Sequence, residues 1–229
     1  MKNTEIELMV PEDLNDITLR QYREFIKLDE TATEADILRI FYNLSNEHIN
    51  SLRINDVTML SNKVLEILKT KPTTNQMIFT MGGVQYGFIP NLEDITYGEN
   101  KDITSYLGRW EYMDRYMAVA FRPITKRKGG LYEIAPYKGS DLLREVMEDA
   151  PLGVVMSSMV FFWTLISSLL DVTQTSLETQ MMNQKTKDTS STHQQYSRGS
   201  GVHIKKSMNL LKEISQDLTK LLNYPSNNA

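Results

Sequence analysis

Apolar residues recur every three or four positions through residues 15–70, which predicts a series of short amphipathic helices. Polar residues able to cap these helices precede each apolar run: Asp16 or Thr18, Thr33, Ser45 and Asn55. Gln21 follows Thr18 by three positions, as in a capping box, and Pro72 ends the series. Because short helices on short loops bury their stripes by packing together, we expect a small helical bundle.

Two glycine pairs lie between runs of strand-forming residues farther along the chain. Gly82-Gly83 separates "MIFTM" from "VQYGFI", and Gly129-Gly130 separates "RPITKRK" from "LYEIAPY". A tight hairpin turn needs positive φ at both central residues, so each pair predicts a β-hairpin. Alternation of Val84, Tyr86 and Phe88 predicts one apolar sheet face, and Pro90 ends that strand.

The segment between the hairpins predicts one long helix. Thr96 and Glu99 form a capping-box pattern at its start, and Pro123 lies near its end. Its apolar stripe consists of Ile103, Tyr106, Leu107, Trp110, Met113, Met117 and Phe121. A short helix is expected over "SDLLREVMED", residues 140–149.

Residues 152–170 carry no charge, and the run is long enough to span a bilayer. Five of these residues are Ser or Thr, and no Lys or Arg occurs between Arg144 and Lys185. The positive charges that flank membrane spans are therefore missing. We expect a buried central helix rather than a membrane span, with Pro151 in its first turn.

The C-terminal part changes character at residues 183–201, which are polar and low in complexity and predict a flexible linker. A final amphipathic helix is expected beyond the linker, with a stripe of Ile204, Met208, Leu211, Ile214, Leu218, Leu221 and Leu222. This helix either docks on a partner chain or folds back on its own body, and periodicity does not distinguish the two.

These patterns together predict a mostly helical α+β protein with two short β-hairpins and two long helices in its middle region. We expect four parts: an N-terminal helical region, 1–72; an α+β core with a buried helix, 73–182; the linker, 183–201; and the C-terminal helix, 202–229.

Composition narrows the chemistry that this chain can perform. Cysteine is absent, which excludes disulfides, thiol catalysis and thiolate metal sites. The net charge of −4 argues against a generally nucleic-acid-binding surface. The acidic excess is local, because residues 1–72 carry 9 Lys and Arg against 13 Asp and Glu. The N-terminal "MKNTEIELMVPEDL" lacks the long apolar run of a signal peptide.

No motif for catalysis, cofactor binding or metal binding stands out. The three histidines, His48, His193 and His203, form no metal-ligand spacing, and "GGVQYG" lacks the Lys-Ser/Thr of a phosphate-binding loop. The neighbouring acids Glu93 and Asp94 are interpreted as a solvated, capping pair. We therefore expect a non-enzymatic protein without a cofactor, a metal or a small-molecule substrate.

Aromatic and methionine side chains favour protein binding instead. The chain has 13 methionines, whose flexible side chains suit adaptable interfaces. The candidate partner-binding residues are Tyr97 and Tyr112, which lie off the apolar stripe, and Ile204, Met208, Leu211, Leu218 and Leu222 of the terminal helix. Lys126, Arg127 and Lys128 lie beside the second hairpin turn; a solvated loop tip is expected there, with nucleic-acid contact as the alternative.

Four sequence segments follow one another in a distinctive order: "YGFIPNLEDITYGE" (86–99), "MAVAFRPIT" (117–125), "YEIAPYKGS" (132–140) and "MVFFWTL" (159–165). In these segments the chain resembles uncharacterised bacteriophage proteins of crAss-like and marine phages, over about residues 77–170. The N-terminal "ITLR…LS…DV" order is similar to phage tail-assembly chaperones. The second resemblance implies a small, helical, non-enzymatic protein that coats the tape-measure protein until tail-tube subunits replace it.

The leading expectation is a phage morphogenesis protein of tail-assembly-chaperone type, present in the host cytoplasm during assembly. Its expected partners are other phage structural proteins, a tape-measure or tail protein in particular, and a homo-oligomer is a further possibility. The first alternative is a structural virion component, such as a connector, ring or tail subunit. The second is a membrane-associated lysis protein, which depends on residues 152–170.

Overall fold

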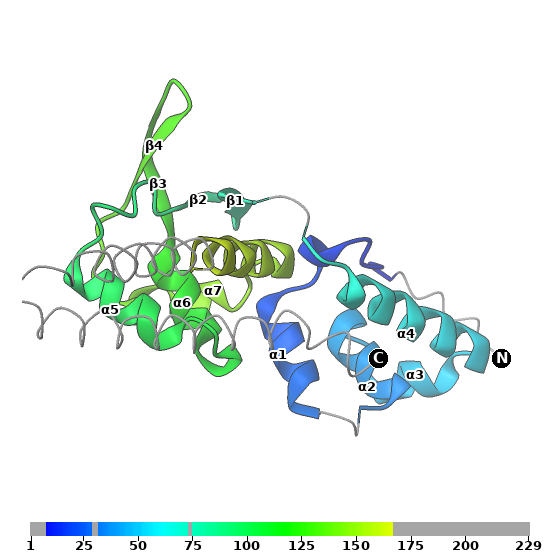
Figure 1. The fold of residues 1–229 in the computed structure, drawn as a ribbon. Helices are drawn as coiled ribbons and strands as arrows, with labels where there is room; N and C mark the ends of the chain where they lie inside the picture. Colours follow the sequence, from blue (N-terminus) through cyan, green and yellow to red (C-terminus); the bar gives the residue numbers. More distant parts are fainter. Residues whose placement is uncertain (1–7, 29–31, 73–74, 167–229) are drawn as a thin grey trace, which may run out of the picture.

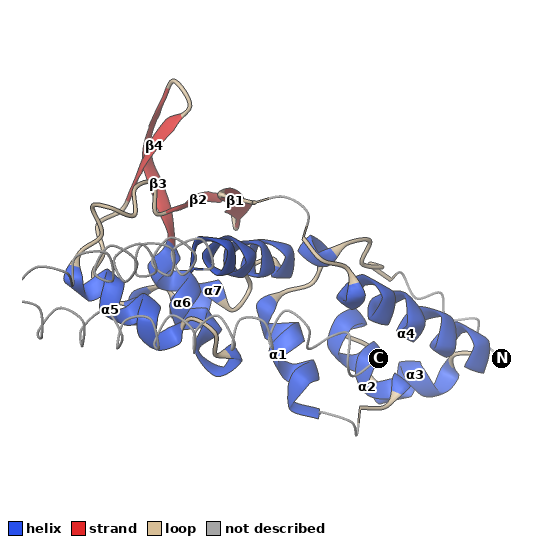
Figure 2. Cartoon of the chain, in the orientation of Figure 1, coloured by secondary structure: helices blue, strands red, loops and turns tan. Residues whose placement is uncertain are grey.

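The computed structural model describes residues 8–28, 32–72 and 75–166 (Figures 1 and 2). A 3-10 turn, η1 (Leu14–Asp16), precedes four helices in the N-terminal region. These helices are α1 (Leu19–Leu28), α2 (Glu34–Tyr42), α3 (Asn46–Ser51) and α4 (Ile54–Lys69). Their apolar faces pack together, which confirms the expected bundle of short helices.

The predicted caps explain where three of these helices begin. Thr18 N–H donates to Gln21 Oε1 at 2.9 Å, and the Gln21 N–H donates back to Thr18 Oγ1 at 3.2 Å. Thr33 forms the same reciprocal box with Asp36, and Ser45 Oγ accepts from the His48 N–H. The fourth helix begins one residue before the predicted Asn55, and Arg53 at its cap position makes no side-chain capping bond.

Both glycine pairs make hairpin turns, as predicted, with φ of 56° and 77° at Gly82-Gly83 and of 58° and 85° at Gly129-Gly130. The strands are β1 (Ile78–Met81), β2 (Val84–Phe88), β3 (Phe121–Lys128) and β4 (Leu131–Ile134). The two hairpins join into one antiparallel sheet of order β1-β2-β3-β4, because β2 pairs with β3. The patterns predicted each hairpin but not this pairing, which joins segments more than 30 residues apart.

The prediction of one long helix between the hairpins is wrong. The chain forms α5 (Tyr97–Tyr106), the 3-10 turn η3 (Trp110–Tyr112) and α6 (Met113–Ala120), and Phe121 already begins β3. Leu107 leaves the helix in an extended conformation, and Gly108 follows with φ of 84°. The apolar residues keep a helical spacing across the break because α5 and α6 both bury their apolar faces in the core. Likewise the expected short helix divides into η4 (Ser140–Leu142) and α7 (Arg144–Met147).

Residues 152–166 form the predicted buried helix, which lies under the sheet beside α6 (Figure 1). Residues 152–159 are all buried. The Phe88 ring meets Phe161 and Phe162 of this helix at centroid distances of 5.3 and 5.8 Å, and Phe121 at 5.3 Å. Pro151 lies just before the helix and accepts its first hydrogen bonds, from Val154 and Val155. Aromatic packing between sheet and helix thus centres the core on this uncharged segment.

In the described part of the chain, no helix has both the length and the apolar character that a membrane span needs. The predicted linker, 183–201, and the predicted terminal helix, 202–229, lie outside the described residues.

Candidate interaction surface

The second hairpin extends beyond the rest of the sheet. Strand β2 pairs with β3 only from Phe121 to Pro123, whereas β3 pairs with β4 as far as Lys128 and Leu131. We call residues 124–134 the arm. Figures 1 and 2 show the arm rising away from the helices, with its turn at the far end.

A close contact between backbone and ring fixes the arm at its base. The Tyr132 ring covers Gly87, where an added Cβ would lie 2.5 Å from Tyr132 Cε2 and 3.0 Å from Ile124 Cγ1. The Tyr132 hydroxyl donates to the Phe88 carbonyl at 2.9 Å, which ties β4 to β2 across β3. Only glycine at position 87 leaves room for this ring. A residue of the first hairpin thus determines where Tyr132 of the second hairpin packs.

A buried ion pair supports the same base from below. Arg122 Nη1, on β3, lies 2.6 Å from Glu99 Oε1, on α5, and the two side chains are only 8% and 6% exposed. Glu99 also accepts hydrogen bonds from the Thr96 N–H at 2.7 Å and from its hydroxyl at 2.6 Å. Burial alone raises the pKa of Glu99, but these hydrogen bonds and Arg122 outweigh it and lower the pKa below its usual value.

Tyr137 completes this cluster after β4. Its ring lies under the Arg122 guanidinium, with 5.5 Å between Cζ and the ring centroid, and its hydroxyl donates to the Asp102 carboxylate of α5. Burial and the Asp102 charge both raise the pKa of Tyr137, so its hydroxyl keeps its proton and stays a donor. Helix α5 therefore holds the base of the arm at two points. Glu99 pairs with Arg122, and Asp102 accepts a hydrogen bond from Tyr137.

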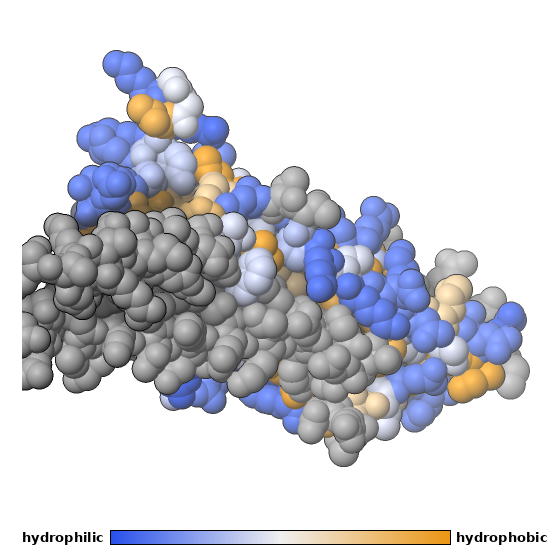
Figure 3. Space-filling model, in the orientation of Figure 1, coloured by the Kyte–Doolittle hydropathy of each residue, from blue (hydrophilic) through white to orange (hydrophobic). Residues whose placement is uncertain are grey.

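The tip of the arm carries cations and one exposed leucine. Lys126 Nζ pairs with Glu133 Oε2 at 2.9 Å across the strands. Arg127 and Lys128 are exposed, and neither forms an ion pair with any described residue. Leu131, opposite Lys128, is 79% exposed. Figure 3 shows the arm as mostly hydrophilic surface, with a small hydrophobic area just below its end. None of these tip side chains contributes to the chain's own core.

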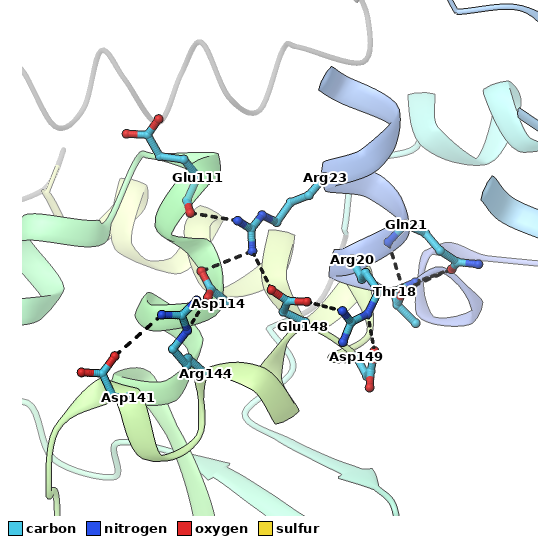
Figure 4. A network of polar contacts seen from close by, with 10 residues as sticks. All are labelled: Thr18, Arg20, Gln21, Arg23, Glu111, Asp114, Asp141, Arg144, Glu148 and Asp149. Carbon is cyan, nitrogen blue, oxygen red and sulfur yellow. Dashed lines mark hydrogen bonds and ion pairs between the residues drawn. The ribbon is translucent and has the colours of Figure 1, made fainter. Parts of the chain in front are cut away.

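Ionisable side chains also gather between α1 and the pair α6 and α7 (Figure 4). Arg23 Nη1 lies 3.3 Å from Asp114 Oδ1 and 3.4 Å from Glu148 Oε1, and Nη2 donates to the Glu111 carbonyl at 3.0 Å. Arg144 Nε approaches the other Asp114 oxygen at 3.5 Å, and the Asp114 side chain is only 3% exposed. Each charge in this cluster faces an opposite charge on another element, which fastens α1 to the core.

Backbone hydrogen bonds continue the same fastening. The Leu19 N–H donates to the Ala150 carbonyl at 2.9 Å, and the Leu152 N–H donates to the Ile17 carbonyl at 2.8 Å. Arg20 adds side-chain ion pairs with Glu148 and Asp149. The arrangement joins the N-terminal helices to the buried helix.

An open pocket of about 560 Å³ lies beside the start of α1. Its lining combines the segment before η1 with the first turn of α1 and the end of α2: Met9, Val10, Pro11, Glu12, Asp16, Thr18, Gln21, Phe41, Tyr42 and Asn43. Glu12 and Asp16 are exposed, form no ion pair with described residues, and are the only charged side chains in this lining. Met9 is 92% exposed at the rim. The pocket is therefore acidic, with an apolar side.

The predicted partner-binding tyrosines do not form one patch. Tyr97 begins α5 and is 84% exposed. Tyr112, past the other end of α5, is half-buried, with its ring 5.9 Å from that of Tyr106 and 4.5 Å from the Arg109 guanidinium. The other five predicted residues, Ile204, Met208, Leu211, Leu218 and Leu222, lie outside the described chain.

Sequence reasoning singled out the cations of the arm but missed the arm itself. The signal is the run Thr125 to Lys128, which is polar on both faces and so cannot be covered by a second layer. The structure shows those four residues exposed. The pocket had no such signal, since Pro11 and Asn43 come together only through folding.

Other described side chains that the sequence analysis singled out lie at the surface, whereas His193 and His203 lie outside the described residues. His48 is exposed on α3, and Asp94 accepts a hydrogen bond from the Asn91 amide at 2.5 Å in an exposed loop. Over residues 8–28, 32–72 and 75–166, no three His, Asp or Glu side chains are grouped so as to hold a metal ion. Comparisons with protein-family models, with curated proteins and with solved structures gave no match to this chain.

Proposed function

We propose that this protein is a non-enzymatic bacteriophage morphogenesis protein that acts by binding other proteins of the particle. The observation that carries the proposal is the arm, whose tip exposes Leu131 and two cations without supporting the fold. An exposed leucine next to two cations without ion-pair partners, at the end of a projecting hairpin, is available for contact with another chain. The resemblance of residues 77–170 to phage proteins supplies the biological setting.

The proposed role within assembly is that of a tail-assembly chaperone. An apolar segment of the tape-measure protein would be covered by helical faces of this chain until tail-tube subunits displace them. The mostly helical body and the resemblance of the N-terminal region to such chaperones support this role. The protein would then act in the host cytoplasm, without a cofactor.

Co-expression of the full chain with the tape-measure protein encoded in the same genome tests this role. We expect the tape-measure protein to stay in the soluble fraction and to co-purify with this chain. Deletion of residues 183–229 should weaken that capture, whereas Lys63→Glu, an exposed change on α4, should leave it intact. A tape-measure protein that is equally insoluble with and without this chain would refute the chaperone role.

The arm also favours a second candidate, a structural component such as a connector, ring or tail subunit. A projecting hairpin is a means for one subunit to reach its neighbour in a closed assembly. Mass spectrometry of purified mature particles distinguishes the candidates. A structural subunit is present there in a fixed copy number, and a chaperone is missing.

A further inference from the structure

We propose that the protein assembles head to tail, with the arm tip of one copy seated in the acidic pocket of the next. This inference goes beyond the proposed function, because it names the partner of the arm as a second copy of this chain. The two surfaces are both present in the structure, and their charge, apolar character and size match.

The arm tip and the pocket carry opposite charges. The arm, residues 124–134, carries three cations and one anion, and Lys126 is already paired with that anion, Glu133. Arg127 and Lys128 form no ion pair with described residues. The pocket offers Glu12 and Asp16, which form no ion pair with described residues either, and Asp16 Oδ2 accepts the N–H groups of Glu12 and Asp13 at 2.8 and 3.3 Å. Seating the tip in the pocket would bring two cations to two carboxylates that have no cation beside them.

The arm tip and the pocket also both expose apolar side chains. Leu131 is 79% exposed at the tip, and Met9 is 92% exposed at the rim of the pocket, next to Val10 and Pro11. Burying these side chains against each other would remove both from water at once. The pocket volume of about 560 Å³ lies within the roughly 300–1,000 Å³ of sites that enclose small ligands. A hairpin tip of one leucine and two neighbouring side chains is of that order.

The arm is not placed to serve its own pocket. The arm rises from the sheet away from the helices (Figure 1). The pocket is lined by the segment before η1, the first turn of α1 and the end of α2. The contact must therefore form between copies. Because the tip and the pocket are different surfaces, the contact is heterologous and produces a ring if it closes and a filament if it does not.

A nucleic acid is a poorer occupant of the arm. Phosphate binding depends on the number of cations that meet the backbone, and this tip offers two unpaired ones in a chain of net charge −4. The exposed leucine beside them has no counterpart in phosphate recognition. A surface that is both acidic and apolar accounts for both features, and the chain itself presents one.

Sedimentation velocity on the purified full chain tests the inference. We expect mass to grow with concentration and to fall as salt is added, because the contact is charged and partly exposed. The arm variant Arg127→Glu with Lys128→Glu, and the pocket variant Glu12→Lys, should each weaken association by more than about tenfold. The matched control, Lys63→Glu with Lys101→Glu, makes the same charge change on exposed positions of α4 and α5 and should associate like the wild type.

Mixing the two impaired variants gives the sharpest readout. The arm variant keeps an intact pocket, and the pocket variant keeps an intact arm, so the mixture should associate more strongly than either variant alone. Circular dichroism of each variant checks that it is folded. A monomeric wild type up to its solubility limit, an arm variant that associates normally, or no complex in the mixture would each overturn the inference.

The sedimentation experiment tests the head-to-tail contact separately from the chaperone role. Sedimentation uses this chain alone, whereas the chaperone test measures the solubility of the tape-measure protein. A chain that assembles but leaves the tape-measure protein insoluble would refute only the proposed chaperone function. A chain that keeps the tape-measure protein soluble as a monomer would refute only the head-to-tail contact. Binding of the arm variant and the wild type to duplex DNA, measured side by side, tests the nucleic-acid alternative.

Discussion

Replacing Arg122 by methionine should lower the free energy of unfolding by about 3 kcal/mol, since it leaves a buried carboxylate without its cation. The Arg122 and Glu99 side chains are 8% and 6% exposed, and their charged atoms lie 2.6 Å apart. Removing one partner of such a pair costs about 3–5 kcal/mol. We expect the lower value for Arg122→Met, because both Thr96 hydrogen bonds to Glu99 remain.

Glu99→Gln should cost slightly more, about 4 kcal/mol, because it leaves the guanidinium buried and Arg122 Nε already lacks a hydrogen-bond partner. The double variant should cost far less than the sum of the two, since the second change removes the unpaired charge that the first one creates. The exposed pair Arg109–Glu111 has the same 2.6 Å separation, but its side chains are 53% and 61% exposed. Arg109→Met should therefore cost less than about 1 kcal/mol.

Urea unfolding followed by far-ultraviolet circular dichroism measures all four variants at neutral pH. The lowered pKa of Glu99 adds a pH signature. A folded-state pKa below the unfolded value of about 4.5 gives stability that is fully present above that pH and is lost as pH falls through the folded value. The gap between wild type and Glu99→Gln should therefore narrow in acid. Equal costs for the buried and exposed arginines, or additive costs in the double variant, would refute the reasoning.

Two glycine predictions follow from backbone geometry and close packing. Gly108→Ala should destabilise the fold by about 1–2 kcal/mol, because φ at this position is 84°. Gly98→Ala is the matched control: it lies within α5, its nearest contact is at 3.5 Å, and it should stabilise the fold by up to about 1 kcal/mol. Thermal unfolding compares the two variants. Gly87→Ala should lower the free energy of unfolding by about 1–3 kcal/mol, because the added methyl group displaces the Tyr132 ring. Hydrogen exchange should then show reduced protection of the β4 amides, and unchanged protection would contradict this prediction.

Local features of the fold were predictable from the sequence because short-range chemistry decides them. The Thr33 and Thr96 capping boxes and the two glycine turns involve residues within three or four positions of one another. The prediction of one long helix was wrong at Gly108. The spacing of apolar residues indicates which side of a helix is buried, but it does not show whether the chain changes direction between two helices. A glycine inside a helical pattern is tolerated in many helices, so Gly108 alone did not mark the break.

Long-range features were beyond the sequence for a different reason. The pairing of β2 with β3 depends on Phe88 meeting Phe121 over the aromatic side chains of the buried helix. Tyr97 lies off the predicted apolar stripe and is 84% exposed. Tyr112 is half-buried, because the break after α5 brings its ring against Tyr106 and Arg109. The acidic pocket likewise exists only because the segment at Pro11 lies against the end of α2.

The side chains of the arm, rather than its backbone, are the part suited to contact. Strand β4 is an edge of the sheet, and an open edge invites pairing with another strand. This edge is short, it carries the Lys126–Glu133 ion pair, and its register is shifted between Ile124 and Lys126. Charges and irregularities of this kind discourage strand addition. Association through the arm should therefore depend on Arg127, Lys128 and Leu131 and respond to salt, whereas edge pairing would persist at high ionic strength.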